Sequence, residues 1–252
     1  MNTVYIGNSL INDVFLGSQR MDDALQSQPK TLPITDGLVF YVDAGLPPSY
    51  IGAGSTVYGL NYVTGTPKTG SIGDGGYSSL YGGTFTFSSA SNPTGILFSD
   101  SGMPSGSQSR TLGGWVYNNA FGGNAVWYGT ANTNQGIGIQ QVGDNAPTLR
   151  FYGYANDMDA TVTNMWNRWV YMAGTFDGTN ARIYLNGSFI ATSNRSGWNT
   201  LLSGTLTVGR TTFGATNGNW INGYQAQAQI YNRALSDAEV LENYNRFSSR
   251  FA

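Results

Sequence analysis

Residues 182–190 of the chain read Arg182-Ile183-Tyr184-Leu185-Asn186-Gly187-Ser188-Phe189-Ile190. This stretch places Asn-Gly between two runs of strand-forming residues. A two-residue type I′ turn needs positive φ at both central positions, which Asn and Gly adopt at low cost. The stretch therefore predicts a β-hairpin.

The rest of the main body continues the same pattern. Short runs rich in Tyr, Phe, Thr and Val alternate with Gly, Asn, Asp and Pro, which is typical of an all-β sandwich. Between Thr56 and Gly83 the sequence is rich in glycine and shows little alternation, so we expect a long irregular excursion there. We predict strands at Leu38–Val42, Thr84–Ser88, Thr111–Tyr117, Ala125–Tyr128, Gly136–Gln140, Leu149–Tyr154, Trp169–Phe176, Ala181–Leu185, Ser188–Thr192, Leu206–Val208 and Ala226–Tyr231.

A short helix is predicted near the end of the sequence. Ser236-Asp237-Ala238-Glu239 matches a capping box, with Ser236 as the N-cap and Glu239 reaching back to it. Leu235 can pack against Val240 as a hydrophobic staple. The chain's two glutamates both lie on this segment, where a cap and a solvated face are favoured over a catalytic role. The apolar stripe expected to face the sandwich is Val240, Tyr244 and Phe247.

The first 23 residues contain a repeat. Val4–Asp13 and Val14–Asp23 match in character position by position, and each unit predicts a short strand closed by a glycine turn. Isolated hairpins are marginal in water, so the repeat should pair with a partner chain or with a copy of itself. The alternative is that these are the first strands of the main domain. The residues expected to carry the pairing are Tyr5, Ile6, Phe15 and Leu16.

The change in composition along the chain suggests three parts. Residues 24–35 contain Gln, Ser, Lys and two prolines and predict a linker. We therefore assign residues 1–23 to a docking or oligomerisation arm, residues 24–35 to the linker and residues 36–252 to the main domain.

Composition excludes several kinds of chemistry. The chain has no histidine and no cysteine, so it holds no Ser-His-Asp triad and no imidazole or thiolate metal site. With 12 basic and 14 acidic residues the net charge is −2, and no basic cluster is present to attract nucleic acid. No apolar run approaches the ~20 residues of a membrane span, and the sequence begins without a basic signal-peptide start. A soluble protein with no membrane partner is expected.

Five segments taken in order carry a resemblance to a known family. They are Gly37–Gly45, Trp166–Gly178, Arg182–Gly187, Leu206–Gly209 and Gln229–Val240. Together they resemble the core motifs of laminin G-like domains, which belong to the concanavalin A-like lectin/glucanase superfamily. The resemblance covers about residues 36–252. It implies a jelly-roll β-sandwich of two antiparallel sheets and leaves the ligand open.

A second resemblance concerns the kind of protein in which such a domain is found. The closing segments Ile230–Ser236 and Asn243–Phe251 resemble copies of this domain in bacteriophage virion proteins, and the repeat resembles short repeats near the start of phage structural proteins. This implies a virion surface protein, either a capsid decoration or a head or tail fibre subunit, assembled in the host cytoplasm. Its partners would be major capsid or fibre proteins, and it would form a homo-oligomer such as a trimer.

The acidic residues offer little for catalysis. Glucanases of this superfamily carry glutamates on a strand, and no predicted strand here contains one. Asp157-Met158-Asp159 places two carboxylates on one face of an extended segment. That pair suits an ordinary polar loop, a calcium or sugar-hydroxyl contact, or catalysis. We predict no enzymatic activity, with calcium as the one candidate cofactor.

The aromatic residues favour carbohydrate binding. Trp115 and Trp169 lie within strands and are predicted to be core. Arg195 could add a donor beside Trp198. We therefore predict a non-enzymatic virion protein that binds glycans, with a carbohydrate-binding module of a bacterial surface or secreted system as the alternative. The candidate sugar-binding residues are Trp127, Tyr128, Trp198, Trp220, Asp157 and Asp159, the last two also being the candidate calcium ligands.

Overall fold

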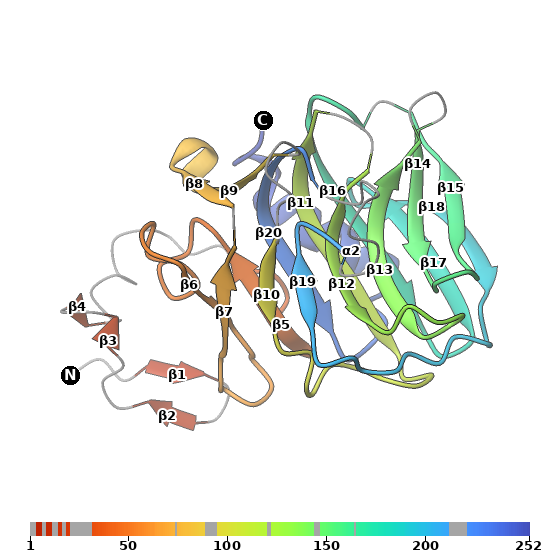
Figure 1. Cartoon of the computed structure of the whole chain (residues 1–252), viewed down its shortest axis with the longest axis horizontal. Helices are drawn as coiled ribbons and strands as arrows, with labels where there is room; N and C mark the ends of the chain where they lie inside the picture. Colours follow the sequence, from red (N-terminus) through yellow and green to blue (C-terminus); the bar gives the residue numbers. More distant parts are fainter. Residues whose placement is uncertain are drawn as a thin grey trace.

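The computed structural model describes the strands at 4–6, 9–11, 15–16 and 19–20, and residues 32–73, 75–88, 95–119, 122–143, 147–163, 165–211 and 221–252. Two large antiparallel sheets face each other, and a helix, α2 (Asp237–Ser248), lies near the end of the chain (Figure 1). The all-β sandwich predicted from the sequence is confirmed.

Sheet I has the strand order β15-β14-β13-β12-β19-β10-β7-β6. Sheet II has the order β18-β17-β16-β11-β20-β9-β8, and β5 also pairs with β20. In sheet I the strands are β15 (Met158–Thr161), β14 (Thr148–Tyr152), β13 (Gly136–Val142), β12 (Asn124–Gly129), β19 (Leu206–Val208), β10 (Ile96–Phe98), β7 (Lys68–Ile72) and β6 (Thr56–Gly59). In sheet II they are β18 (Ser188–Asn194), β17 (Asn180–Leu185), β16 (Trp169–Phe176), β11 (Arg110–Asn118), β20 (Gly223–Tyr231), β9 (Thr84–Phe87), β8 (Gly76–Ser78) and β5 (Leu38–Asp43).

Each strand predicted from the sequence is present, but the predicted irregular excursion is wrong. Residues 56–83 contain β6, β7 and β8, together with a 3₁₀ turn, η1 (Leu80–Gly82). Glycine occupies buried positions of these strands because aromatic rings lie against the backbone there. A Cβ on Gly59 would lie 2.3 Å from Phe40, and one on Gly70 would lie 2.3 Å from Phe98. The usual apolar alternation is therefore absent from the sequence, although β6 and β7 are half-buried.

The Asn-Gly hairpin forms as predicted. Asn186 has φ 51° and Gly187 has φ 78°, and Leu185 pairs with Ser188 across the turn. A Cβ on Gly187 would lie 2.9 Å from Leu241 of α2. The turn thus sets the register of β17 with β18. It also lets α2 pack closely against the hairpin at Gly187.

The central strands of sheet II, β16, β11, β20 and β5, are buried on both faces. One face meets sheet I in the main core, and the other packs against α2 in a second cluster that includes Trp115, Tyr231, Val240 and Phe247. The predicted capping box is present, since Ser236 accepts from Glu239 N and Glu239 accepts from Ser236 N.

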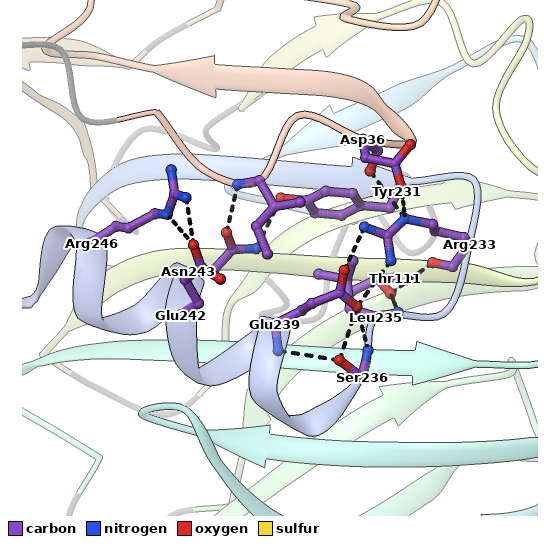
Figure 2. Close-up of polar contacts among 11 residues, drawn as sticks. Asp36, Thr111, Tyr231, Arg233, Leu235, Ser236, Glu239, Glu242, Asn243 and Arg246 are labelled. Carbon is purple, nitrogen blue, oxygen red and sulfur yellow. Dashed lines mark hydrogen bonds and ion pairs between the residues drawn. The ribbon is translucent and has the colours of Figure 1, made fainter.

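The helix is tied down by polar contacts at its start and its middle (Figure 2). The Arg233 guanidinium donates to both carboxylate oxygens of Glu239, at 3.0 and 2.7 Å, and lies 2.9 Å from Asp36. These hydrogen bonds from Arg233 are the main reason that the pKa of Glu239 falls to about 2. Buried Asn243 donates to Tyr231 Oη at 2.9 Å and accepts from Ile34 N at 2.8 Å.

The chain following α2 is held by a buried ion pair. Arg250 Nη1 lies 2.8 and 2.9 Å from the two carboxylate oxygens of Asp43, which is 4% exposed. The same carboxylate accepts from Tyr41 Oη at 2.8 Å and from Gln227 Nε2 at 2.7 Å. Asp43 therefore links β5, β20 and the end of the chain.

The repeat forms two small hairpins, β1 (Val4–Ile6) with β2 (Ser9–Ile11) and β3 (Phe15–Leu16) with β4 (Gln19–Arg20). Tyr5 pairs with Leu10, and Phe15, ten residues later, pairs with Arg20, so both units share one register. Among the described strands, these four pair with neither sheet of the sandwich. The assignment of residues 1–23 to a separate arm stays a prediction.

Within the described part of the chain, α2 is too short and too polar to cross a membrane.

Replacing Arg250 by alanine should lower the free energy of unfolding by about 3–5 kcal/mol, because Asp43 would stay buried without its cation. Urea denaturation at neutral pH, followed by tryptophan fluorescence, measures this. Arg246→Ala is the control, since its ion pair with Glu242 is exposed and should be worth less than about 1 kcal/mol. Equal losses for the two variants would contradict the role given to Asp43.

Candidate functional site

The structure corrects the prediction of exposed aromatic platforms. Trp127 and Tyr128 are 0% exposed and Trp198 is 1% exposed, so none of the three can offer a ring face to a sugar. Trp220 lies outside the described residues. Trp115 and Trp169, predicted to be core, are 2% and 9% exposed, which confirms that prediction.

Glycine explains why these aromatic residues are buried. A Cβ on Gly136 would lie 2.4 Å from Trp127, and one on Gly153 would lie 1.8 Å from Trp198 Nε1. The glycine-rich surroundings of the two tryptophans indicated surface turns in the sequence. The glycines that make room for the two indoles, Gly136 and Gly153, lie instead on other segments of the chain. Trp198 Nε1 donates to Asn156 O at 2.9 Å, which anchors the ring in a loop.

Asp157 and Asp159 do lie on one side of the chain, as predicted, and they share one cation. Arg150 donates to both oxygens of Asp159 at 2.7 Å and lies 3.4 Å from Asp157. Asp157 also accepts from Gly153 N at 3.1 Å. Burial raises the pKa of Asp157, while these contacts oppose the rise.

The arginine supplies the positive charge that a calcium ion would bring to this pair. Among the described residues, no group of three or more acidic side chains gathers at one point. The calcium site stays a prediction, with a donor set of two carboxylates.

Three loops meet around this pair. Asn134 N donates to Gly153 O at 2.9 Å, and Asn156 Nδ2 donates to Asn134 Oδ1 at 2.8 Å. Arg195, named in the sequence analysis as a possible donor beside Trp198, donates to Asp157 O at 2.9 Å. Non-glycine residues with positive φ gather here, which places backbone strain in these loops. They are Asn134 at 68°, Tyr154 at 32° and Ala155 at 60°.

A fourth loop, residues 99–109, joins the same end of the sandwich through the bridge between Gly106 and Thr200. This loop is held by hydrogen bonds from Arg110, a residue that was not predicted from the sequence to have a role. The guanidinium is fully buried and donates to Pro104 O at 3.1 Å, Gly106 O at 2.7 Å and Gln108 O at 2.8 Å. The sequence did offer one indication that Arg110 is buried, because it is the single charged residue of β11 and lies at the start of that strand.

Beside this loop lies an open groove of about 550 Å³, which we call the loop groove. Its apolar walls come from Val39, Met103 and Pro104, all buried. Its polar walls come from Gln108, Ser109 and Asn232, and Gly102 completes it. No charged residue lines it among the described residues.

Acidic groups near this end of the sandwich are already engaged. Asp100 accepts from Ser203 N at 2.7 Å and from Gly204 N at 3.0 Å. Burial alone would raise the pKa of Asp177, but hydrogen bonds from the backbone of Asn180 and Thr179 bring it below its usual value. The loop end can therefore bind through amides, hydroxyls and apolar contacts, and its carboxylates are committed to structure.

The fold and this loop end define a lectin-like jelly roll. The profile of the concanavalin A-like lectin/glucanases superfamily matches residues 90–241, and the chain belongs to that superfamily. No curated protein sequence matches it.

Solved structures share the fold at low sequence identity. The binding domain of botulinum neurotoxin serotype G has a TM-score of 0.62 at 14% identity, over 84% of this chain and 51% of that chain. The binding domain of Paraclostridial Mosquitocidal Protein 1 has a TM-score of 0.60 at 14% identity, over 84% and 52%. The chain thus spans about half the length of these toxin domains. Domain 4 of AbnA, a GH43 extracellular arabinanase from Geobacillus stearothermophilus in complex with arabinotriose, has a TM-score of 0.56 at 17% identity, over 82% and 98%.

Gly153→Ala should cost about 1–3 kcal/mol of stability, because the added carbon overlaps the buried Trp198 ring. Chemical denaturation measures the loss, and near-ultraviolet circular dichroism reports the displaced indole. Gly197→Ala, in the neighbouring loop, is the control, since the nearest atom to its new carbon would be 3.8 Å away. If both variants were as stable as the parent, the packing described for Trp198 would be wrong.

Proposed function

We propose that this chain is a non-enzymatic carbohydrate-binding protein and that the loop groove is its binding site. The observation that carries the proposal is the groove's chemistry: buried apolar walls beside amide and hydroxyl groups, with no charged lining. Pockets that combine apolar surface with a few placed polar groups fit small ligands. A neutral, hydroxyl-rich ligand matches such walls without the cost of burying an unpaired charge.

The engagement of the carboxylates that the structure describes near the loops supports binding without turnover. Glycoside hydrolysis needs two carboxyl groups on either side of the scissile bond. Asp157 and Asp159 both face Arg150, and Asp100 is bonded to backbone N–H groups. The two glutamates lie on α2, where Glu239 serves the capping box and Glu242 pairs with Arg246.

The structural relatives support a binding role by analogy. Two of them are described as binding domains of toxins, and a third is an arabinanase domain solved with arabinotriose. At these sequence identities the likeness concerns the fold, so their ligands suggest the class of probe to use and not the ligand of this chain.

We further propose that the chain is a bacteriophage virion surface protein, as a capsid decoration or fibre subunit, with other virion proteins as partners. The two hairpins of the arm support this, because four short strands outside the sandwich leave unpaired edges for neighbouring chains. A homo-oligomer is the simplest arrangement that pairs them. The arabinanase domain favours the second candidate, a carbohydrate-binding module of a secreted or surface system.

Gln108→Ala and Asn232→Ala should each weaken binding of a neutral oligosaccharide at least tenfold, because each removes an amide from the groove. A glycan array selects the oligosaccharide, and isothermal titration calorimetry measures its affinity with and without a calcium chelator. Asn245→Ala, an exposed amide change on α2, is the control and should bind like the parent. Unchanged affinity in both groove variants would refute the groove as the site, and release of cleaved sugar would refute the binding-only role.

Tyr5→Asp and Phe15→Asp should each convert an oligomeric full-length chain to a smaller species, because a carboxylate cannot be buried at a strand pairing without a partner. Sedimentation velocity measures the change. Asn245→Asp adds the same charge to an exposed site of α2 and should leave the oligomer intact. A parent chain that is already monomeric would contradict the arm as an assembly device.

A further inference from the structure

The side-chain amide of Gln108, on one wall of the loop groove, is fixed in one orientation. Ser105 N donates to Gln108 Oε1 at 2.7 Å. A backbone N–H can only donate, so the amide atom that faces it is the oxygen. Gln108 Nε2 therefore faces away from Ser105, and its two N–H groups have no acceptor among the described residues.

The backbone of Gln108 is held as well. Gln108 N donates to Ser105 O at 3.1 Å, and Gln108 O accepts from Arg110 Nε at 2.8 Å. The Arg110 side chain is fully buried, so it holds this carbonyl from inside the sandwich. A side chain that is already positioned loses little conformational entropy when a ligand binds. Gln108 thus presents a preorganised donor to the groove.

Ser109 supplies an acceptor. Its hydroxyl donates to the backbone oxygen of Asp177 at 3.0 Å. A hydroxyl has one proton and two lone pairs, so Ser109 Oγ, with its proton engaged, is left to accept. Gln108 and Ser109 are consecutive in the sequence, and both line the groove. The groove therefore offers a donor and an acceptor from neighbouring residues.

The apolar walls of the groove are aliphatic. They come from Val39, Met103 and Pro104. Flat aromatic rings, on which the face of a sugar ring can stack, are absent from the lining among the described residues. Aliphatic walls of this kind suit a compact apolar group such as a methyl, whose removal from water is favourable.

These features together specify a chemical group. No charged residue lines the groove in the described part of the chain, so an uncharged group avoids the cost of burying an unpaired charge. A secondary acetamide is neutral and combines an acceptor carbonyl, a donor N–H and a methyl. A hydroxyl could pair with Gln108 or Ser109, but it brings no apolar group to the aliphatic walls.

We propose that the loop groove selects a sugar that carries an acetamido group. The acetyl carbonyl accepts from Gln108 Nε2, the amide N–H donates to Ser109 Oγ, and the methyl packs against the aliphatic walls. The amide of Asn232 is left for a hydroxyl of the same sugar. This inference rests on the function proposed above and adds to it the class of sugar.

Cellotriose and chitotriose test the proposal. They share a β-1,4-linked glucose backbone and differ only in the acetamido group that replaces the hydroxyl at C2. Isothermal titration calorimetry of the full-length chain measures both affinities, and we expect chitotriose to bind at least tenfold more tightly. In saturation-transfer NMR, the acetyl methyl protons should receive the strongest transfer, because they lie against the aliphatic walls.

Gln108→Glu separates the donor from the shape of the loop. A carboxylate oxygen still accepts from Ser105 N, but the donor to the acetyl carbonyl is lost. We expect this variant to bind chitotriose at least tenfold more weakly than the parent chain. Ser107→Ala is the matched control, since Ser107 is exposed in the same loop and does not line the groove, and it should bind like the parent.

A neutral oligosaccharide without an acetamido group that bound as tightly as chitotriose, and was lost in Gln108→Ala, would overturn this inference and leave the proposed function standing. Chitotriose binding that was unchanged in Gln108→Glu would also overturn it. If no neutral oligosaccharide bound, the inference and the proposed function would fail together. The sugar pair and the saturation-transfer spectrum use the parent chain, so a Gln108→Glu chain that failed to fold would not prevent the test.

Discussion

This sandwich depends on one kind of contact, in which an aromatic ring packs directly against the backbone of a glycine. Phe40 covers Gly59, Phe98 covers Gly70, and Phe151 covers Gly174, each so closely that a Cβ would lie within 2.7 Å of the ring. Trp127 and Trp198 repeat the arrangement in the loops and strands of sheet I. The composition follows from this contact, since the chain combines 35 glycines with 13% aromatic residues and few charges. Close packing of this kind leaves no room for a methyl group at the covered glycine.

This packing also decides where a ligand can bind. Most large rings are used inside the two cores, so they cannot serve as exposed sugar platforms. Among the described residues, the loop groove, with its amides and buried apolar walls, is the surface that we propose for recognition. The carboxylates described near the loops are held by Arg150 or by backbone N–H groups. These features are the basis for the proposal that the ligand is neutral.

Local signals in the sequence predicted much of the fold. The Asn186-Gly187 turn, the Ser236 capping box and the strands predicted from the sequence depend on neighbouring residues, and all are present. Strands β6, β7, β8, β10 and β15 were not predicted. What escaped prediction depends on residues far apart in the sequence. Gly59 and Gly70 could not be recognised as strand positions without the rings that cover them.

The same holds for the candidate site. Trp198 was placed at the surface because glycine and asparagine surround it, but Gly153, more than forty residues earlier, provides its place in the interior. The spacing of Asp157 and Asp159 predicted that they lie on one side of the chain. It could not predict that Arg150 forms ion pairs with both of them. The loop groove combines residues from β5, from the loop before β11 and from the segment after β20. No single stretch of sequence could therefore predict it.

The central claim is that this chain holds an intact neutral saccharide and does not transform it. A crystal structure of the full-length chain, determined after soaking with a neutral oligosaccharide chosen by a glycan array, tests that claim most directly. The account predicts an uncleaved sugar in the loop groove, against Gln108 and Asn232. A cleaved sugar lying against Asp157 and Asp159, with Arg150 displaced, would contradict it.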